Sequence, residues 1–216
     1  MEPPSTVEAE AFRSHLLLWS EENLRKYAWR ETDSPYRVLV AEILLQKTFA
    51  DKVEPIYEEF VDRYPDLERL ADVEVENVAS LLKPLGLQNV RARALIDIAT
   101  KYAEEGVPED EEELLQLPYV GPYAANATLC FAFGRRRPVV DANTVRIYNR
   151  TFGADFTPQD DQAWKLADRM LPDDDYQRFN LALLDFGAKI CTADAPHCQE
   201  CFYRDQCEYY ATKTQS

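Results

Sequence analysis

The 216-residue chain contains no run of about eighteen apolar residues, the length that a helix needs to cross a bilayer. Its first residues, Met1-Glu2-Pro3-Pro4, lack the basic region and the apolar core of a secretory signal peptide. Both absences argue against a membrane partner, so we expect a soluble protein of the cytoplasm. The length suffices for one large domain or two small ones with a hydrophobic core.

Lysine is also scarce. The chain has eight lysines and sixteen arginines against 39 acidic residues, and its formal net charge is −15. This charge argues against a nucleic-acid partner, because phosphate contacts need Lys and Arg. However, the acidic residues are spread along the whole chain, as expected of a protein solvated in concentrated salt, where the screening length falls to about 3 Å at 1 M. Composition alone leaves two interpretations open: an acidic protein that binds no DNA, and a DNA-binding protein of a high-salt cytoplasm.

Periodic apolar residues predict a chain built from helices. Ser5 or Thr6 can cap a first helix, and Pro35 can open a second one. From residue 51 to residue 103, three apolar stripes at helical spacing follow one another, separated by prolines and glycines. Only stretches of a few residues resemble strands, so we expect an all-α fold.

One predicted helix carries a single carboxylate on an apolar surface. Residues 38–45 are apolar on every side except at Glu42. A helix that is apolar all round is buried, so we expect Glu42 in or at the wall of a cavity. Glu42 can face a ligand there, or it can be a structural carboxylate that pairs with an arginine or a helix terminus. Gln46-Lys47-Thr48 ends the helix in polar residues, which indicates a tip at the surface.

A short break between two apolar runs lies in the segment Leu117-Pro118-Tyr119-Val120-Gly121-Pro122-Tyr123-Ala124-Ala125, where Pro118 and Gly121 interrupt the apolar pattern. Pro122 suits the first turn of a helix, where its missing N–H has no helical partner. The pattern predicts a helix, a tight hairpin and a second helix. Backbone N–H groups that a hairpin turns outward at a helix start can hold an anion such as a DNA phosphate, independently of sequence.

About twenty residues later, the strand-like pair Val139-Val140 leads to Asp141 at the start of another helix, with Asn143 beside it and Arg146 and Arg150 one and two turns on. A carboxylate therefore follows the predicted phosphate-binding hairpin. Asp141 alone also suits the position of a helix N-cap.

Four of the five cysteines, Cys191, Cys198, Cys201 and Cys207, have the spacing C-x6-C-x2-C-x5-C within seventeen residues. In a cytoplasmic protein, clustered thiols indicate metal ligands before disulfides. Four-thiolate zinc sites usually contain two C-x2-C pairs, and here only one is present. The unequal loops therefore favour a 4Fe-4S cluster, with zinc as the alternative. Cys130 stands alone in an apolar helix and is expected in the core.

The hairpin, the Asp141 helix and the cysteine spacing resemble the helix-hairpin-helix-GPD superfamily of DNA glycosylases, in the branch of endonuclease III and adenine glycosylases. The resemblance covers residues 35–210 and is nearest to archaeal-type enzymes that remove thymine or uracil opposite guanine. It implies one helical domain at residues 34–135 and a second at residues 1–33 plus 136–216. It also implies an active-site cleft between these domains and a cluster loop at 191–207.

The resemblance assigns roles to individual residues. Glu42 takes the base-recognition role, and Gln46 fills the space that the flipped nucleotide leaves in the duplex. Flipping costs a few kcal/mol and is least costly at a mispair. As the base leaves, Asp141 stabilises the positive charge that grows on the deoxyribose, or it activates the attacking water. The other implied DNA contacts are Leu117, Val120, Gly121, Asn143 and Arg146.

Tyr123 stands where strand-cleaving members of the superfamily carry a lysine. A phenol cannot form a Schiff base, so we expect a monofunctional enzyme that uses water as the nucleophile. Two residues depart from the usual pattern. Tyr119 replaces the first glycine of the hairpin and must avoid a positive φ or accept a strained one, and Ala124 replaces a hydroxyl residue.

Arginines are expected to supply the remaining phosphate contacts. Arg91 and Arg93 follow a glycine-containing turn, and we expect both to face solvent or phosphate. The segment 135–137 is three consecutive arginines, which we expect to join Arg146 at the DNA.

The implied partner is double-stranded DNA with a mismatched or damaged base, bound by a monomer. Because the chain stops nine residues after Cys207, we expect no C-terminal domain of the adenine-glycosylase type. Tyr123 also favours the mismatch-thymine enzymes. Other interpretations stay open: an adenine glycosylase acting opposite guanine or 8-oxoguanine, an endonuclease III-like enzyme, an iron-sulfur DNA-binding module without turnover, and a redox-sensing regulator.

Overall fold

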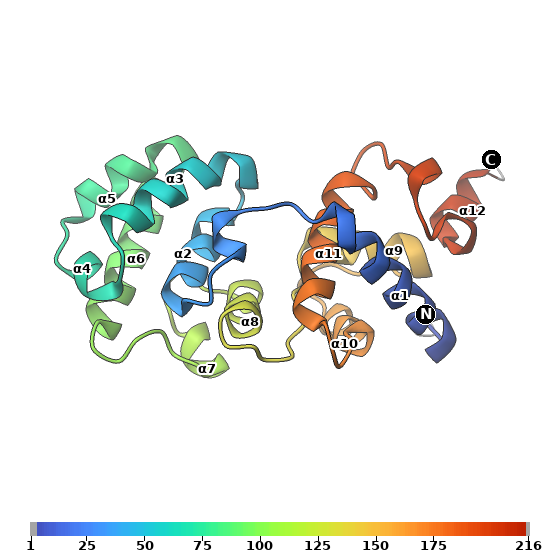
Figure 1. The fold of residues 1–216 in the computed structure, drawn as a ribbon, viewed down its shortest axis with the longest axis horizontal. Coiled ribbons are helices and arrows are strands. Elements are labelled where there is room, and N and C mark those ends of the chain that lie inside the picture. Colours follow the sequence, from blue (N-terminus) through green and yellow to red (C-terminus); the bar gives the residue numbers. More distant parts are fainter. Residues whose placement is uncertain (1–3, 215–216) are drawn as a thin grey trace. The chain divides into compact units, whose positions relative to one another are not determined.

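The structure is a computed structural model that describes residues 4–214, and it is helical with no strand among these residues. The expected all-α class is confirmed (Figure 1). None of the described helices is both long enough and apolar enough to cross a membrane. The helices are α1 Thr6–Asn23, η1 Ala28–Arg30, α2 Pro35–Leu45, α3 Ala50–Arg63, α4 Leu67–Ala71, α5 Val75–Leu82, η2 Lys83–Leu85, α6 Gln88–Tyr102, α7 Glu111–Leu115, α8 Pro122–Phe131, α9 Ala142–Phe152, α10 Asp161–Met170, α11 Tyr176–Lys189, η3 Cys198–Glu200, η4 Arg204–Gln206 and α12 Glu208–Thr214.

The chain divides into two compact units. The continuous unit is Lys26–Arg135, and the discontinuous unit combines Met1–Arg25 with Arg136–Ser216. The chain therefore passes from one unit to the other twice. Each unit has its own hydrophobic core.

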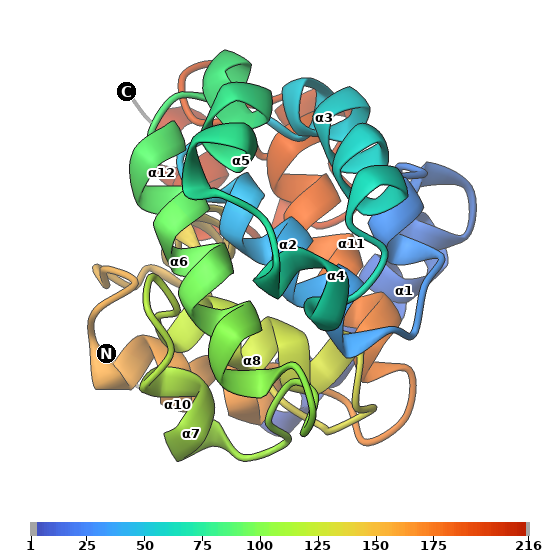
Figure 2. The ribbon, with the colours of Figure 1, turned by 90° about the vertical axis from the view of Figure 1, so that its left-hand side faces the viewer.

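The continuous unit is built around α2. Pro35 occupies the first turn of this helix, as the sequence predicts, and the side chain of Ser34 caps it. All residues of α2 from Val38 to Leu44 are buried. In Figure 2, α2 lies in the middle of α3, α6 and α8, and it packs against each of them. This arrangement explains why the helix is apolar on every side.

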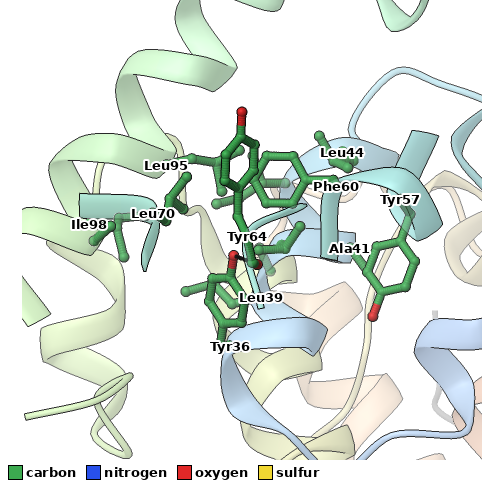
Figure 3. Close-up of a cluster of buried hydrophobic side chains, with 14 of the residues drawn as sticks. Tyr36, Leu39, Ala41, Leu44, Tyr57, Phe60, Tyr64, Leu70, Leu95 and Ile98 are labelled. Carbon is green, nitrogen blue, oxygen red and sulfur yellow. Dashed lines mark hydrogen bonds between the residues drawn. The ribbon is translucent and has the colours of Figure 1, made fainter. Parts of the chain in front are cut away.

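Aromatic and aliphatic side chains from several helices fill the core of the continuous unit (Figure 3). The hydroxyl of Tyr36 on α2 donates to the carbonyl oxygen of Tyr64 at 2.6 Å, which satisfies a buried polar group at the end of α3. Burial raises the pKa of Tyr36, and it raises the pKa of Tyr57 to about 12. Both phenols therefore stay neutral at physiological pH.

The discontinuous unit places α1 beside α11, and α11 beside α9. Ser5 and Glu8 form a capping box at the start of α1. Phe12 of α1 is fully buried, and its ring meets those of Tyr148 and Tyr203 edge to face. The N-terminal helix is thus part of this core.

The Val139-Val140 pair belongs to no strand, which corrects the strand-like interpretation. Both residues are buried in a segment without regular structure. The side chain of Asn180 on α11 takes the place of a neighbouring strand: its Oδ1 accepts from the Val139 N–H at 3.2 Å, and its Nδ2 donates to the Arg137 carbonyl at 2.9 Å. These bonds satisfy the Val139 N–H and the Arg137 carbonyl without a strand. A pair of buried valines in an irregular segment has the same sequence pattern as a short strand.

Candidate functional site

Glu42 lies on α2 and is 4% exposed, so its expected burial is confirmed. The helix that carries it is buried along its length, which fixes the backbone of this residue firmly. Tyr123 belongs to the same unit. It lies in the first turn of α8, directly after Pro122, and is half-buried.

The predicted hairpin connects α7 to α8 within the continuous unit. The side chains of Leu117 and Val120 are buried in the core. Their N–H groups donate to the carbonyl oxygens of Leu114 and Leu117, at 3.1 and 3.2 Å. These two residues therefore shape the hairpin instead of turning N–H groups outward, which corrects part of the prediction. Gly121, the N-cap of α8, is exposed at the helix start.

Tyr119 adopts the left-handed conformation with a φ of 65°. At this position, where the family usually has glycine, the sequence leaves open whether Tyr119 avoids a positive φ or accepts one. The structure shows the positive φ, which costs a non-glycine residue about 1–2 kcal/mol. Its carbonyl oxygen accepts a hydrogen bond from Gln46 Nε2 at 2.8 Å. Gln46, the C-cap of α2, therefore contacts the hairpin directly.

Arg91 is fully buried, and the expectation that it faces solvent or phosphate is wrong. Arg93, two residues further on α6, is exposed as expected. The helical period could have predicted this burial. Arg91 precedes the core residues Leu95 and Ile98 by four and seven positions, so it lies on the same face of α6. Its guanidinium reaches the carbonyl oxygen of Gln46 at 2.5 Å.

Asp141 is the N-cap of α9 in the discontinuous unit, so the structural role that its position allows is confirmed. Oδ1 accepts from the Thr144 N–H at 2.8 Å. Oδ2 accepts from Asn143 Nδ2 at 2.7 Å. The carboxylate is half-buried, and both of its oxygen atoms are held by N–H donors. Such a group has a fixed position and orientation.

Asn143 and Arg146 link Asp141 to the first cysteine of the C-terminal loop. Arg146 Nη2 donates to Asn143 Oδ1 at 2.7 Å and to the Gly187 carbonyl at 2.8 Å. Arg146 Nε donates to the Cys191 carbonyl at 2.8 Å. The two predicted DNA contacts thus belong to an internal chain of hydrogen bonds from the carboxylate to the cysteine loop.

Other arginines expected at DNA also have partners within their own unit. Arg135 pairs with the carboxylate of Glu109. Arg136 donates to the carbonyl oxygens of Asp168 and Leu171, at 3.0 and 2.7 Å, and pairs with the Asp168 carboxylate. Arg136 therefore caps the C-terminus of α10, where a cation is favourable. The sequence could not show these partners, because they lie 26 to 35 residues away.

Cys191, Cys198, Cys201 and Cys207 line one cavity, whose wall also includes Phe186, Ile190 and Tyr203. Burial raises the pKa of Cys201 to about 11, and the three other thiols add to this effect, while a backbone hydrogen bond from Tyr203 opposes it. Arg150 Nη1 lies 3.6 Å from Cys191 Sγ. Four thiols with an N–H donor beside them fit an iron-sulfur cluster, whose ligands are Cys thiolates tuned by hydrogen bonds to sulfur.

No three His, Cys, Asp or Glu side chains among residues 4–214 are close enough together to hold a single metal ion. In a 4Fe-4S cluster each thiolate binds a different iron, so the thiols surround the cluster instead of meeting at one point. Cys130 on α8 is fully buried, and its expected place in the core is confirmed.

The sequence profile of the HhH-GPD superfamily of base excision DNA repair proteins matches residues 40–172, well over half of the chain. The chain belongs to this superfamily. The matched range contains Glu42, Gln46, Tyr123 and Asp141, and it ends before the cysteine loop.

Relatives in the superfamily match the chain over nearly its full length. A thymine/uracil-DNA glycosylase of Methanothermobacter thermautotrophicus is 34% identical over 97% of this chain and 98% of that protein. A thymine-DNA glycosylase of Aeropyrum pernix is 39% identical over 93% of this chain and 95% of that protein. The solved structure of a thermostable thymine-DNA glycosylase has a TM-score of 0.90, with 35% identity, over 94% of this chain and 97% of that chain.

Proposed function

We propose that this protein is a DNA glycosylase of base excision repair that hydrolyses the N-glycosidic bond of a flipped nucleotide, and that it releases thymine or uracil opposite guanine. The observation that carries the reaction type is Asp141, a carboxylate fixed through both oxygen atoms at the start of α9. The names of the thymine and thymine/uracil glycosylases that match this chain over nearly its full length support the choice of base.

In this reaction, positive charge grows on the deoxyribose as the bond to the base breaks. A carboxylate already held in place stabilises that charge without reorganising during the reaction. Thr144 N–H and Asn143 Nδ2 provide the hold for Asp141. The same carboxylate can orient or deprotonate the water that attacks the sugar carbon.

Glu42 is assigned to the base. Its carboxylate can accept a hydrogen bond from the N–H on the pairing edge of thymine or uracil, because a flipped base exposes this edge. With adenine, the same carboxyl could protonate a ring nitrogen. Glu42 therefore supports a glycosylase without selecting the base by itself.

Tyr123 determines the fate of the sugar. It occupies the position where strand-cleaving members carry the attacking lysine, and its phenol cannot form an imine. Water is then the nucleophile, so the product is an intact strand with an abasic site. The protein is assigned as monofunctional and monomeric.

The start of α8 is assigned to the DNA backbone. Gly121 is exposed there, and the first N–H groups of a helix attract a phosphate through the helix dipole. Gln46 is assigned to the space that the flipped nucleotide leaves in the duplex. Both residues belong to the continuous unit and are connected through Tyr119.

The four cysteines of the C-terminal loop are assigned as ligands of a 4Fe-4S cluster. When bound, the cluster would be held by the thiolates of segments 191, 198–201 and 207 and would supply electron-transfer chemistry. Arg150 supports this loop, because its Nη1 and Nη2 donate to the carbonyl oxygens of Thr192 and Ala193, each at 2.6 Å. Arg146, one turn earlier on α9, supports the same loop through the Cys191 carbonyl.

The test is incubation with duplexes that contain G·T, G·U, A·8-oxoguanine or an oxidised pyrimidine, followed by alkali to reveal abasic sites. We expect cleavage after alkali in the G·T and G·U duplexes and no cleavage before it. Faster release of adenine opposite 8-oxoguanine under single-turnover conditions would assign the protein as an adenine glycosylase. Binding of every duplex without base release would exclude a glycosylase and favour a DNA-binding module without turnover.

A further inference from the structure

Arg91 is the largest fully buried side chain of the described residues, and the proposed chemistry does not use its charge. A buried guanidinium is costly unless its N–H groups find acceptors. Its hydrogen bonds go to the carbonyl oxygens of Leu85 at 3.1 Å, Gly86 at 2.8 Å and Gln46 at 2.5 Å, and to Thr48 Oγ1 at 2.8 Å. These acceptors are all neutral, so Arg91 stabilises backbone at two loops instead of balancing a carboxylate.

Arg91 is also linked to the hairpin, through Gln46. Burial lowers the pKa of Arg91. Gln46, whose carbonyl accepts from Arg91, donates its side-chain amide to the Tyr119 carbonyl at 2.8 Å. The end of α2, the loop before α6 and the hairpin before α8 are therefore connected by one chain of hydrogen bonds through Gln46 and Arg91.

Each of the three joined loops contains a strained residue. Lys47, Leu87 and Tyr119 have φ values of 58°, 51° and 65°, and they are three of the four non-glycine residues with positive φ among residues 4–214. A left-handed conformation costs such a residue about 1–2 kcal/mol. It persists only where the surroundings fix it, and such residues concentrate at functional sites.

Two exposed apolar side chains directly follow residues of this hydrogen-bond network. Phe49, directly after Thr48, is 80% exposed, and Leu87, directly after Gly86, is 45% exposed. Exposed apolar groups beside a polar residue such as Gln46 suit a surface that contacts stacked bases. The loops that carry them are the loops that Arg91 connects.

We propose that Arg91 is a positioning residue for DNA binding, which fixes Gln46 and the hairpin as one rigid surface before DNA arrives. The benefit is preorganisation, because loops that are already ordered lose less conformational entropy on binding. This proposal rests on the proposed function only in that Gln46 and the hairpin are taken as DNA contacts. Arg91 itself touches neither the base nor the sugar in this mechanism.

The test compares Arg91→Met with Arg93→Met, which removes the same charge from an exposed position on the same helix. The measurement is the binding of a duplex that carries a tetrahydrofuran abasic analogue opposite guanine, relative to the undamaged duplex. We expect Arg91→Met to lose roughly tenfold in this ratio, as misplaced contact groups do, and Arg93→Met to keep it within about twofold. An unchanged ratio for Arg91→Met would refute the proposal.

A double-mutant cycle with Gln46→Ala separates positioning from general stability. If Arg91 acts through Gln46, the double variant Arg91→Met/Gln46→Ala loses no more than the worse single variant. Additive losses would show that Arg91 acts elsewhere. Circular dichroism at the assay temperature establishes that each variant is folded.

Thr48→Val provides a second route if Arg91→Met does not fold. It removes one acceptor of the guanidinium and keeps the shape of the side chain, and Arg91→Lys keeps the charge but loses the planar fork. We expect both to shift the binding ratio in the same direction by a few-fold, and full binding by both would refute the proposal. Selective binding of the analogue without base release from any duplex would refute the proposed function alone.

Discussion

Asp141 has two roles that can be separated: its side chain caps α9, and its negative charge carries the proposed reaction. Asparagine accepts the same hydrogen bond from the Thr144 N–H and is as good an N-cap as aspartate. Asp141→Asn therefore removes the charge, and with it the acceptor of Asn143 Nδ2, while keeping the hydrogen bond at the helix start. This substitution tests the residue that carries the proposed reaction.

We expect Asp141→Asn to reduce single-turnover thymine release by at least about a hundredfold, the loss typical of removing one preorganised electrostatic group. Binding of the abasic-analogue duplex and the thermal midpoint should remain close to those of the unmodified protein. Asp160→Asn, at the exposed N-cap of α10, is the matched control and should keep full activity. Normal turnover by Asp141→Asn would remove this residue from the chemistry.

The second prediction at the level of one side chain concerns Tyr123. Tyr123→Lys places an amine where strand-cleaving members have one, so it should form a Schiff base that borohydride can trap on DNA. The unmodified protein and Tyr123→Phe should show at most weak trapping. Lys47 directly follows Gln46 in the sequence, and Lys47→Met shows whether its amine causes any background trapping. Efficient trapping of the unmodified protein would contradict water as the nucleophile.

At the level of elements, the contact of α9 with α11 depends on a glycine. A Cβ added at Gly187 would lie 2.6 Å from Asn143 Cβ. The carbonyl oxygen of Gly187 accepts a hydrogen bond from Arg146. The absence of a side chain lets the two helices approach closely enough for Arg146 to reach both Gly187 and Cys191. The asparagine and arginine of the proposed site are therefore held by α11.

Gly187→Ala should lower the free energy of unfolding by about 1–3 kcal/mol, because the new methyl group forces the helices apart. Urea denaturation followed by circular dichroism measures this change. Gly121→Ala is the control, since no atom lies within 4 Å of its added Cβ and its φ is −102°. Equal stability of the two variants would mean that α9 and α11 can separate at no cost.

The cysteine loop makes a prediction at the same scale. The protein purified without oxygen should be yellow-brown, and Cys198→Ser should lose both the colour and thermal stability, because cluster binding contributes to folding of the loop. Cys130→Ala should keep the colour, since Cys130 is a core residue of α8. A colourless protein that contains one zinc ion would refute the cluster.

At the level of the whole molecule, a net charge of −15 must be reconciled with a DNA partner. Arg136 and Arg146 donate to carbonyl oxygens within the protein, so fewer cations remain for phosphate than the sequence indicates. A helix N-terminus binds phosphate without a charged side chain. Salt at about 1 M would also screen the repulsion between the acidic surface and DNA.

We therefore expect a shallow salt dependence of DNA binding. If about three phosphates or fewer are neutralised, the slope of log K against log[KCl] is no steeper than about −3. Fluorescence anisotropy with a labelled duplex between 50 mM and 1 M KCl measures this slope, and base release should persist or rise over the same range. A slope near −6, with activity lost by 200 mM, would indicate a basic DNA-binding surface instead.

The sequence by itself determined the local features. The all-α class, the caps at Ser5 and Asp141, the buried Glu42 and the hairpin all follow from periodicity, capping residues and prolines within a few positions of one another. The spacing of the cysteines likewise indicated that they act together as metal ligands, and in the structure they line one cavity.

Only the tertiary structure decided which polar groups meet. Arg91 and Gln46 are 45 residues apart, and Gln46 and Tyr119 are 73 residues apart, so no local pattern joins them. The helical period of α6 places Arg91 on the core face, but the partners of its guanidinium and the positive φ of Tyr119 are seen only in the tertiary structure. A buried polar side chain takes the partners that the packed helices bring to it, because leaving it without hydrogen bonds costs more than the strain needed to form them.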